Sequence, residues 1–166
     1  QVKTYHQVRK VHPKVKKITG VKTDDDTPFE MTYDKLIIAT GARAFTPNIQ
    51  GRDLPGVFTV RNLIDAEKIH NYIKENKPRH CVVAGGGYIG LEMIEALHNQ
   101  GIRCTLVERL DRVMVSVDEE IARQLEKELN AHNVDILLRT SLAGIGKSRD
   151  GHLDVFLAGG PGRITT

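Results

Sequence analysis

Residues 80–97 have the sequence HCVVAGGGYIGLEMIEAL, in which a short apolar run leads into closely spaced glycines. The run from Cys81 to Ala84 is rich in β-branched residues, as a buried parallel strand is. After the glycines, apolar residues recur at helical spacing: Ile89, Met93, Ile94 and Leu97. The glycines are therefore expected between a strand and a helix.

The glycines at positions 85, 87 and 90 have the spacing G-x-G-x-x-G of a dinucleotide-binding turn. Gly85 permits a tight turn, Gly87 lets the backbone approach a pyrophosphate, and Gly90 lets the helix pack closely on the strand. Unpaired N–H groups and the dipole at the start of the helix favour negative phosphates. A purely structural glycine-rich turn is the alternative, because this spacing alone is a weak signal.

A second strand and an acidic residue support the nucleotide interpretation. Residues 104–107 predict another buried strand, and Glu108 follows it directly. Glu108 lies near the offset of about 20 residues at which a carboxylate accepts hydrogen bonds from an adenosine ribose. Such a carboxylate repels a 2′-phosphate, so the sequence favours NAD(H) over NADP(H). Arg109 and Arg112 complicate this preference, because a neighbouring arginine can bind that phosphate.

The composition bounds the class of protein. The chain has 166 residues, of which 40% are hydrophobic and 27% charged, as in an ordinary globular protein. The net charge is only +3, and the lysines near the amino end are not interleaved with aromatic residues as nucleic-acid stacking requires. We therefore expect no nucleic-acid partner. The sequence shows no apolar run of membrane-spanning length and no signal peptide, so we expect a cytoplasmic protein without a membrane partner.

The two cysteines, Cys81 and Cys104, each fall in a predicted buried strand. They do not form a C-x-x-C pair, and no Cys/His cluster has the spacing of metal ligands. We expect core thiols rather than a redox pair, and no metal site. The acidic run 24–26 predicts a solvated hairpin tip rather than a cation site, because no further oxygen ligands follow it.

The first 46 residues predict mainly β-structure. Short strands are expected over Val2–Tyr5, Gln7–Val11, Lys16–Lys22 and Phe29–Tyr33. A further buried strand is expected over Leu36–Ala39, ending at Thr40-Gly41. Residues 43–56 contain prolines and glycines without an apolar period and predict an extended connection.

The later elements complete an α/β unit. Residues 58–61 predict a short strand. Asn62 predicts the cap of a helix with Asp65 in its first turn. Residues 66–73 of that helix predict an apolar stripe that packs on the sheet. Residues 118–132 predict an amphipathic helix and residues 134–138 a third parallel strand. Residues 143–166 predict a three-stranded meander. We expect the parallel sheet to lack its last strand, as in a piece of a larger protein.

Three blocks, in this order, resemble the pyridine nucleotide-disulfide oxidoreductase family. Residues 33–42, YDKLIIATGA, are similar to its second flavin motif, and residues 58–66, FTVRNLIDA, to the start of its nicotinamide domain. The glycine turn with ER at 108–109 and DR at 111–112 is similar to the branch of coenzyme A-disulfide reductase and NADH oxidase or NADH peroxidase. The resemblance implies a Rossmann-like NAD(P)-binding domain at 47–166 with a parallel sheet and a β-meander. A β-rich remnant of an FAD domain would precede it at 1–46.

The resemblance also implies roles for individual residues. Tyr88 would be a movable gate at the flavin–nicotinamide junction, Glu92 would reach the nicotinamide, and Glu108 would hold the ribose. The implied NAD-binding set is Gly85, Gly86, Gly87, Tyr88, Ile89, Gly90, Glu92, Glu108 and Arg109. In a whole subunit, FAD would touch Val8, Thr40, Gly41 and Arg61. The residues alone favour a plainer interpretation, in which Tyr88 is an exposed aromatic residue and Glu92 a first-turn acid stabilised by the helix dipole.

The implied parent reaction is hydride transfer from NADH to FAD, followed by reduction of a disulfide, dioxygen or peroxide in a homodimer. Neither cysteine sits where the family has its redox cysteine, so we expect NAD(H) binding without turnover and no catalytic residue in this chain. A non-catalytic NAD-binding redox-sensing module is the alternative, although it has no evident use for the flavin-type block at Thr40-Gly41. We expect residues 1–46, without partner strands, to be disordered or to exchange strands, so that copies self-associate.

Overall fold

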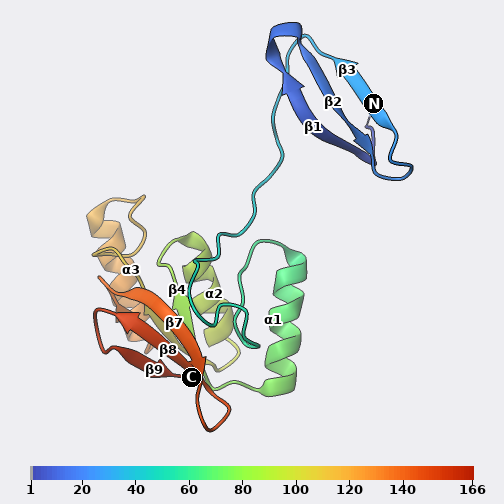
Figure 1. Ribbon diagram of the computed structural model, residues 1–166. Coiled ribbons are helices and arrows are strands. Elements are labelled where there is room, and N and C mark those ends of the chain that lie inside the picture. Colours follow the sequence, from blue (N-terminus) through green and yellow to red (C-terminus); the bar gives the residue numbers. More distant parts are fainter. Residues whose placement is uncertain (1) are drawn as a thin grey trace. The chain divides into compact units, whose positions relative to one another are not determined.

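The computed structural model describes residues 2–166 and divides the chain into two compact units, one that ends at Ala42 and one that begins at Arg43. The first unit is an antiparallel sheet. The second combines a parallel sheet, three helices and a separate antiparallel sheet (Figure 1). The predicted α/β fold class is confirmed.

The first unit contains β1 (His6–His12), β2 (Lys17–Lys22) and β3 (Pro28–Thr32), in the order β1-β2-β3. A short 3-10 helix, η1 (Pro13–Val15), joins β1 to β2. The acidic loop joins β2 to β3, and its Asp25 accepts hydrogen bonds from the N–H and hydroxyl of Thr27 at 3.0 and 2.6 Å. The predicted hairpin tip is confirmed. The three strands pair with one another within residues 6–32. The expectation that residues 1–46 are disordered or exchange strands between copies stays a prediction.

Three of the predicted strands are wrong. Residues 2–5 end in a turn, because Tyr5 adopts a left-handed φ of 59° that no strand continues through. Residues 36–39 and 58–61 have no strand pairing, and Ile37 and Ile38 are 89% and 71% exposed. An apolar run becomes a strand only where a neighbour pairs its N–H and C=O groups. Residues 2–166 provide no such neighbour for these two runs.

The second unit is built on a parallel sheet of order β4-β5-β6, formed by β4 (His80–Ala84), β5 (Arg103–Val107) and β6 (Asp135–Leu137). Helix α2 (Tyr88–His98) connects β4 to β5, and α3 (Glu119–Ala131) connects β5 to β6. Parallel neighbours need such crossover connections. The predicted strand–glycine turn–helix order, the second helix and the third parallel strand are confirmed.

The sheet is covered on both faces. On one face α2, α3 and the loop after β5 form the main core, made of Ile94, Leu97, Ile102, Cys104, Leu106, Val113, Met114 and Val134. The other face carries the predicted meander, β7 (Ser141–Lys147), β8 (Leu153–Ala158) and β9 (Arg163–Thr165), in the order β7-β8-β9. Val107 of β5 packs there with Val155 and Leu157 of β8. Burial on both faces explains why the central strands read as continuous apolar runs.

Helix α1 (Leu63–Asn76) begins at a complete capping box. The Asn62 side chain accepts from the Asp65 N–H at 3.1 Å, and the Asp65 carboxylate accepts from the Asn62 N–H at 3.2 Å. The predicted cap is confirmed. The predicted packing of the stripe holds in part, because Ile73 packs against the main core whereas Ala66, at the start of the stripe, is exposed.

Candidate nucleotide-binding site

The glycine turn lies at the carboxyl ends of the parallel strands. The N–H of Gly85 donates to the carbonyl of Val107, the last residue of β5, at 2.9 Å. The N–H of Glu108 donates in turn to the carbonyl of Leu137, the last residue of β6, at 2.9 Å. The turn and the acidic residue are thus attached to adjacent strand ends. In open α/β sheets, ligands bind in the crevice outside these ends.

Two glycines have geometric reasons to be glycine. Gly85 has a φ of +108°, which L-residues with side chains rarely adopt. A Cβ on Gly90 would lie 1.9 Å from the Gly85 carbonyl oxygen, so a side chain has no room where α2 leaves the turn. A Cβ on Gly85 or Gly87 would meet no atom within 4 Å. The turn is therefore closed toward the helix and open on the other side, which is the shape a pyrophosphate needs.

The amino end of α2 offers N–H groups rather than a cap. Gly87 stands at the N-cap position and supplies no side-chain acceptor, and the first turn has no acidic residue. Helix α1 of the same chain has both a side-chain cap and an acidic first turn. The first N–H groups of an α-helix have no partner within the helix. Those of α2 are consequently available to an anion from outside.

Glu108 is attached to this turn through its side chain. Oε2 accepts a hydrogen bond from the Gly86 N–H at 2.6 Å, and Oε1 accepts one from the Leu110 N–H at 2.7 Å. Short bonds to a carboxylate are among the stronger hydrogen bonds in proteins and fix its orientation. An ionised carboxylate has about four lone-pair sites. About two of them therefore remain for hydroxyl donors of a ligand.

The loop after Glu108 lies against the turn. The N–H of Met114 donates to the carbonyl of Gly86 at 2.8 Å, and Val113 and Met114 are 0% and 5% exposed. Arg109 is exposed, whereas the Nε atom of Arg112 is buried and has no hydrogen-bond partner in residues 2–166. Sequence reasoning missed the part that Val113 and Met114 play. Their apolar character within a polar loop was the available signal.

The remaining NAD candidates lie at the start of α2. Tyr88 and Ile89 are 68% and 59% exposed in its first turn. Glu92 is exposed in the second turn, so the interpretation of Glu92 as a first-turn acid is wrong, because the helix begins at Tyr88. The structure thus brings the glycines, Glu108 and the first turn of α2 together on one unit, and Arg109 lies beside them in sequence.

The four FAD candidates are distributed over both units. Val8 lies in β1 and is 46% exposed, and Thr40 and Gly41 lie in the segment without regular secondary structure that ends the first unit. Arg61 lies in the second unit, where its N–H donates to the Asp65 carboxylate at 3.0 Å. Neither unit by itself therefore holds the whole set.

The two cysteines face each other within the parallel sheet. Cys81 of β4 and Cys104 of β5 are register partners, and their Sγ atoms are 3.5 Å apart as free thiols. The hydrogen bond between them, with burial, raises the pKa of Cys81, and the same bond lowers the pKa of Cys104. Cys104 is 1% exposed. The prediction that both fall in sheet strands is confirmed.

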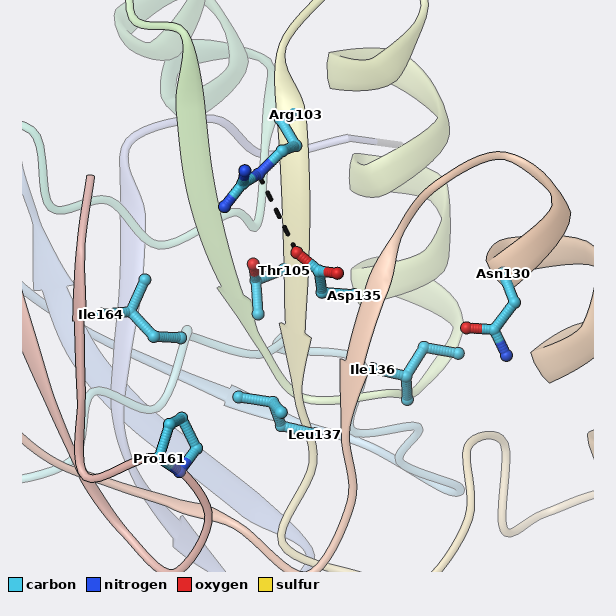
Figure 2. A pocket seen from close by; sticks show the side chains of 8 residues that line it. All are labelled: Arg103, Thr105, Asn130, Asp135, Ile136, Leu137, Pro161 and Ile164. Atoms are coloured by element: carbon cyan, nitrogen blue, oxygen red, sulfur yellow. Dashed lines mark ion pairs between the residues drawn. The ribbon is translucent and has the colours of Figure 1, made fainter.

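A separate hollow of about 420 Å³ lies over β5 and β6, lined by residues of both strands and by Ile164 of β9 (Figure 2). At its rim Arg103 Nε lies 3.8 Å from Asp135 Oδ2. None of the predicted site residues lines it. In residues 2–166 no group of three or more His, Cys, Asp or Glu side chains is placed to hold a metal ion. No helix there has the length and apolar character needed to cross a membrane.

A comparison with known protein families identifies the family of this chain. The family model of the pyridine nucleotide-disulphide oxidoreductases matches residues 1–163. This chain belongs to that family. The family uses FAD and NAD(P)H, and the match extends over both units of the chain. The predicted family resemblance is confirmed.

Individual relatives show the same relationship. Coenzyme A disulfide reductase of Staphylococcus haemolyticus is 33% identical over 158 residues, which cover 95% of this chain and 34% of that protein. The solved structure of reduced Bacillus anthracis CoADR-RHD has a TM-score of 0.79 and 34% identity, covering 97% of this chain and 28% of the other. The water-forming NADH oxidase from Lactobacillus brevis, bound to NADH, has a TM-score of 0.77 and 27% identity over 97% of this chain and 35% of the other. The chain thus spans about a third of the length of these relatives.

Proposed function

We propose that this chain forms the NAD(H)-binding part of a flavin-dependent pyridine nucleotide-disulfide oxidoreductase. The observation that carries this proposal is the uncapped, sterically open glycine turn that Glu108 holds through the Gly86 N–H. In the parent, NADH supplies a hydride to FAD, from which electrons pass to a disulfide, dioxygen or peroxide. The protein residues bind and orient the dinucleotide.

Each part of the site is assigned to one part of the nucleotide. The open backbone at Gly87 and the N–H groups at the start of α2 accommodate the pyrophosphate. Glu108 accepts the ribose hydroxyls of the adenosine half, with Arg109 beside it. Tyr88, Ile89 and Glu92 continue along α2 toward the nicotinamide half.

We assign the flavin-facing role to Val8, Thr40, Gly41 and Arg61. Residues 1–46 are then part of an FAD domain, and residues 47–166 belong to an NAD domain. Cys81 and Cys104 pack within the sheet rather than at a substrate surface, so they are not redox residues of the reaction. We therefore expect this chain alone to bind NAD(H) without turnover.

A non-catalytic NAD-binding sensor would use the same glycine turn. The family match supports the enzyme instead, because it includes residues 33–42 and the first unit as well as the turn. The preference for NADH over NADPH follows from charge. A carboxylate at Glu108, fixed by two backbone donors, repels a 2′-phosphate at the position where it accepts ribose hydroxyls.

The test is calorimetric titration of the chain with NADH and, separately, with NADPH. We expect saturable NADH binding and much weaker NADPH binding. Glu108→Ala removes charge-assisted hydrogen bonds of about 1.5–3 kcal/mol, so the affinity for NADH should fall at least about tenfold. The preference for NADH over NADPH should become smaller. Glu120→Ala, an exposed acidic residue in the first turn of α3, is the matched control and should bind as the wild type does. Unchanged affinity and selectivity in Glu108→Ala would remove this residue from the site.

A further inference from the structure

The loop between β5 and α3 is fixed by a side chain from the middle of α3. Glu126 Oε1 accepts a hydrogen bond from the backbone N–H of Val113 at 3.1 Å. Val113 is 0% exposed, and Glu126 is half-buried. A buried N–H without an acceptor is costly. Glu126 therefore satisfies a donor that water reaches poorly.

The bond lies one residue from the contact between the loop and the glycine turn. The next residue, Met114, donates its N–H to the Gly86 carbonyl at 2.8 Å, and the Gly86 N–H donates to Glu108 at 2.6 Å. Val113 Cγ1 would lie 3.3 Å from a Cβ on Gly86, as would Glu108 Oε2. The loop thus binds the carbonyl of Gly86, and the carboxylate of Glu108 binds its N–H.

The loop conformation needs such support. Met114 has a φ of +46°, in the left-handed region, which is unfavourable for a residue with a side chain. Residues in this region persist where surrounding contacts fix them. Within this loop, the Val113–Glu126 bond is next to Met114 along the chain and connects it to a regular helix.

We propose that Glu126 is a positioning residue for the adenosine end of the nucleotide site. It acts from α3 without touching the nucleotide, by fixing Val113 and, through Met114, the carbonyl side of Gly86. This inference rests on the proposed NAD(H) function. It adds a residue remote in sequence from both the glycines and Glu108.

Four variants separate this role from general stability. In Glu126→Ala the loop relaxes so that the Val113 N–H finds water. NADH binding must then restore the loop and leave this donor unpaired, which should weaken binding about tenfold. Glu126→Gln keeps an acceptor oxygen and should bind within about twofold of wild type. Glu126→Asp, shorter by one methylene, should be intermediate and serves if the alanine variant fails to fold. Glu128→Ala, an exposed residue of the same helix, should bind as the wild type does.

The experiment is calorimetric titration of the whole chain with NADH and with ADP-ribose, which lacks the nicotinamide. A positioning role at the adenosine end predicts the same fold-loss for both ligands in Glu126→Ala. Hydrogen exchange should quicken at the Val113 and Gly86 amides. Non-additivity is the second readout: in a Glu108→Ala background, Glu126→Ala should cost less than about threefold, because both residues act on Gly86.

The possible results are distinguishable. If the wild type binds neither NADH nor ADP-ribose, the proposed function fails. If the wild type binds but folded Glu126→Ala binds within twofold of it, the positioning role is wrong and the proposed function stands. Equal losses in the alanine and glutamine variants would also overturn it, because they would show that the charge acts rather than the hydrogen bond.

Discussion

Alanine at two glycines of the same turn should separate folding from binding. A Cβ on Gly90 would lie 1.9 Å from the backbone oxygen of Gly85, whereas a Cβ on Gly87 would meet nothing within 4 Å. Gly87 has φ −87° and ψ −174°, which any residue adopts. The two positions therefore differ in steric cost.

The magnitudes follow from these distances. A backbone oxygen cannot move aside as a side chain can, so Gly90→Ala belongs at the upper end of overpacking costs, about 3 kcal/mol. Helix propensity returns about 1 kcal/mol, which leaves about 2 kcal/mol. For a chain of this size that lowers the unfolding midpoint by about 4–8 °C. In Gly87→Ala, the loss of a favourable N-cap residue is offset by reduced entropy of the unfolded chain, so stability should change by less than about 0.5 kcal/mol.

The effects of the two substitutions on NADH affinity should be the reverse of their effects on stability. The Cβ of Gly87→Ala occupies the open side of the turn, where the pyrophosphate approaches, so NADH affinity should fall at least about tenfold in a protein as stable as the wild type. Thermal unfolding followed by circular dichroism gives the stabilities, and calorimetric titration gives the affinities. Wild-type NADH affinity in Gly87→Ala, or a wild-type unfolding midpoint in Gly90→Ala, would refute the reasoning.

Two further predictions concern stability. Burial, with the nearby Arg103 charge, lowers the pKa of His80 below its usual value, although Asp135 partly opposes this. As the pH falls, the unfolded chain therefore takes up this proton before the folded chain does. The free energy of unfolding should fall as the pH decreases below about 6.5 and level off below the pKa of the folded state. Between pH 7.5 and 5.5 the free energy of unfolding should change less in His80→Gln than in the wild type, and an equal change would contradict the assignment. Asn62→Ala removes the capping box of α1 and should lower the free energy of unfolding in urea by about 1 kcal/mol. An unchanged urea midpoint would refute this prediction.

The parts of the fold that local sequence determines were predictable. The glycine turn depends on Gly85 and Gly90, whose backbone geometry admits no side chain, and the cap of α1 depends on two residues three positions apart. Residues 36–39 were mispredicted for the opposite reason. Their apolar character predicts a strand, but strand formation depends on a partner, which local sequence does not reveal.

The candidate site shows the same division. The positions of the glycines and of Glu108 followed from their spacing. The hydrogen bond from the Gly86 N–H to the Glu108 carboxylate did not, because it joins residues that follow two different strands. The hydrogen bond between Glu126 and Val113 was even harder to predict from the sequence. An exposed-looking glutamate of an amphipathic helix carries no sign that a loop N–H thirteen residues earlier lies within 3.1 Å.

The distribution of site residues over the two units has a consequence for the proposed reaction. All the residues proposed to bind NAD(H), together with Glu126, lie in the unit that begins at Arg43, and the hydrogen bonds of Glu108, Met114 and Glu126 around the turn stay within that unit. On the proposed function, we therefore expect nucleotide binding to need nothing from the strands β1–β3. The flavin set differs, since Val8 and Thr40 belong to one unit and Arg61 to the other. On the proposed function, dinucleotide binding is a property of one folded unit, whereas hydride transfer depends on the placement of two.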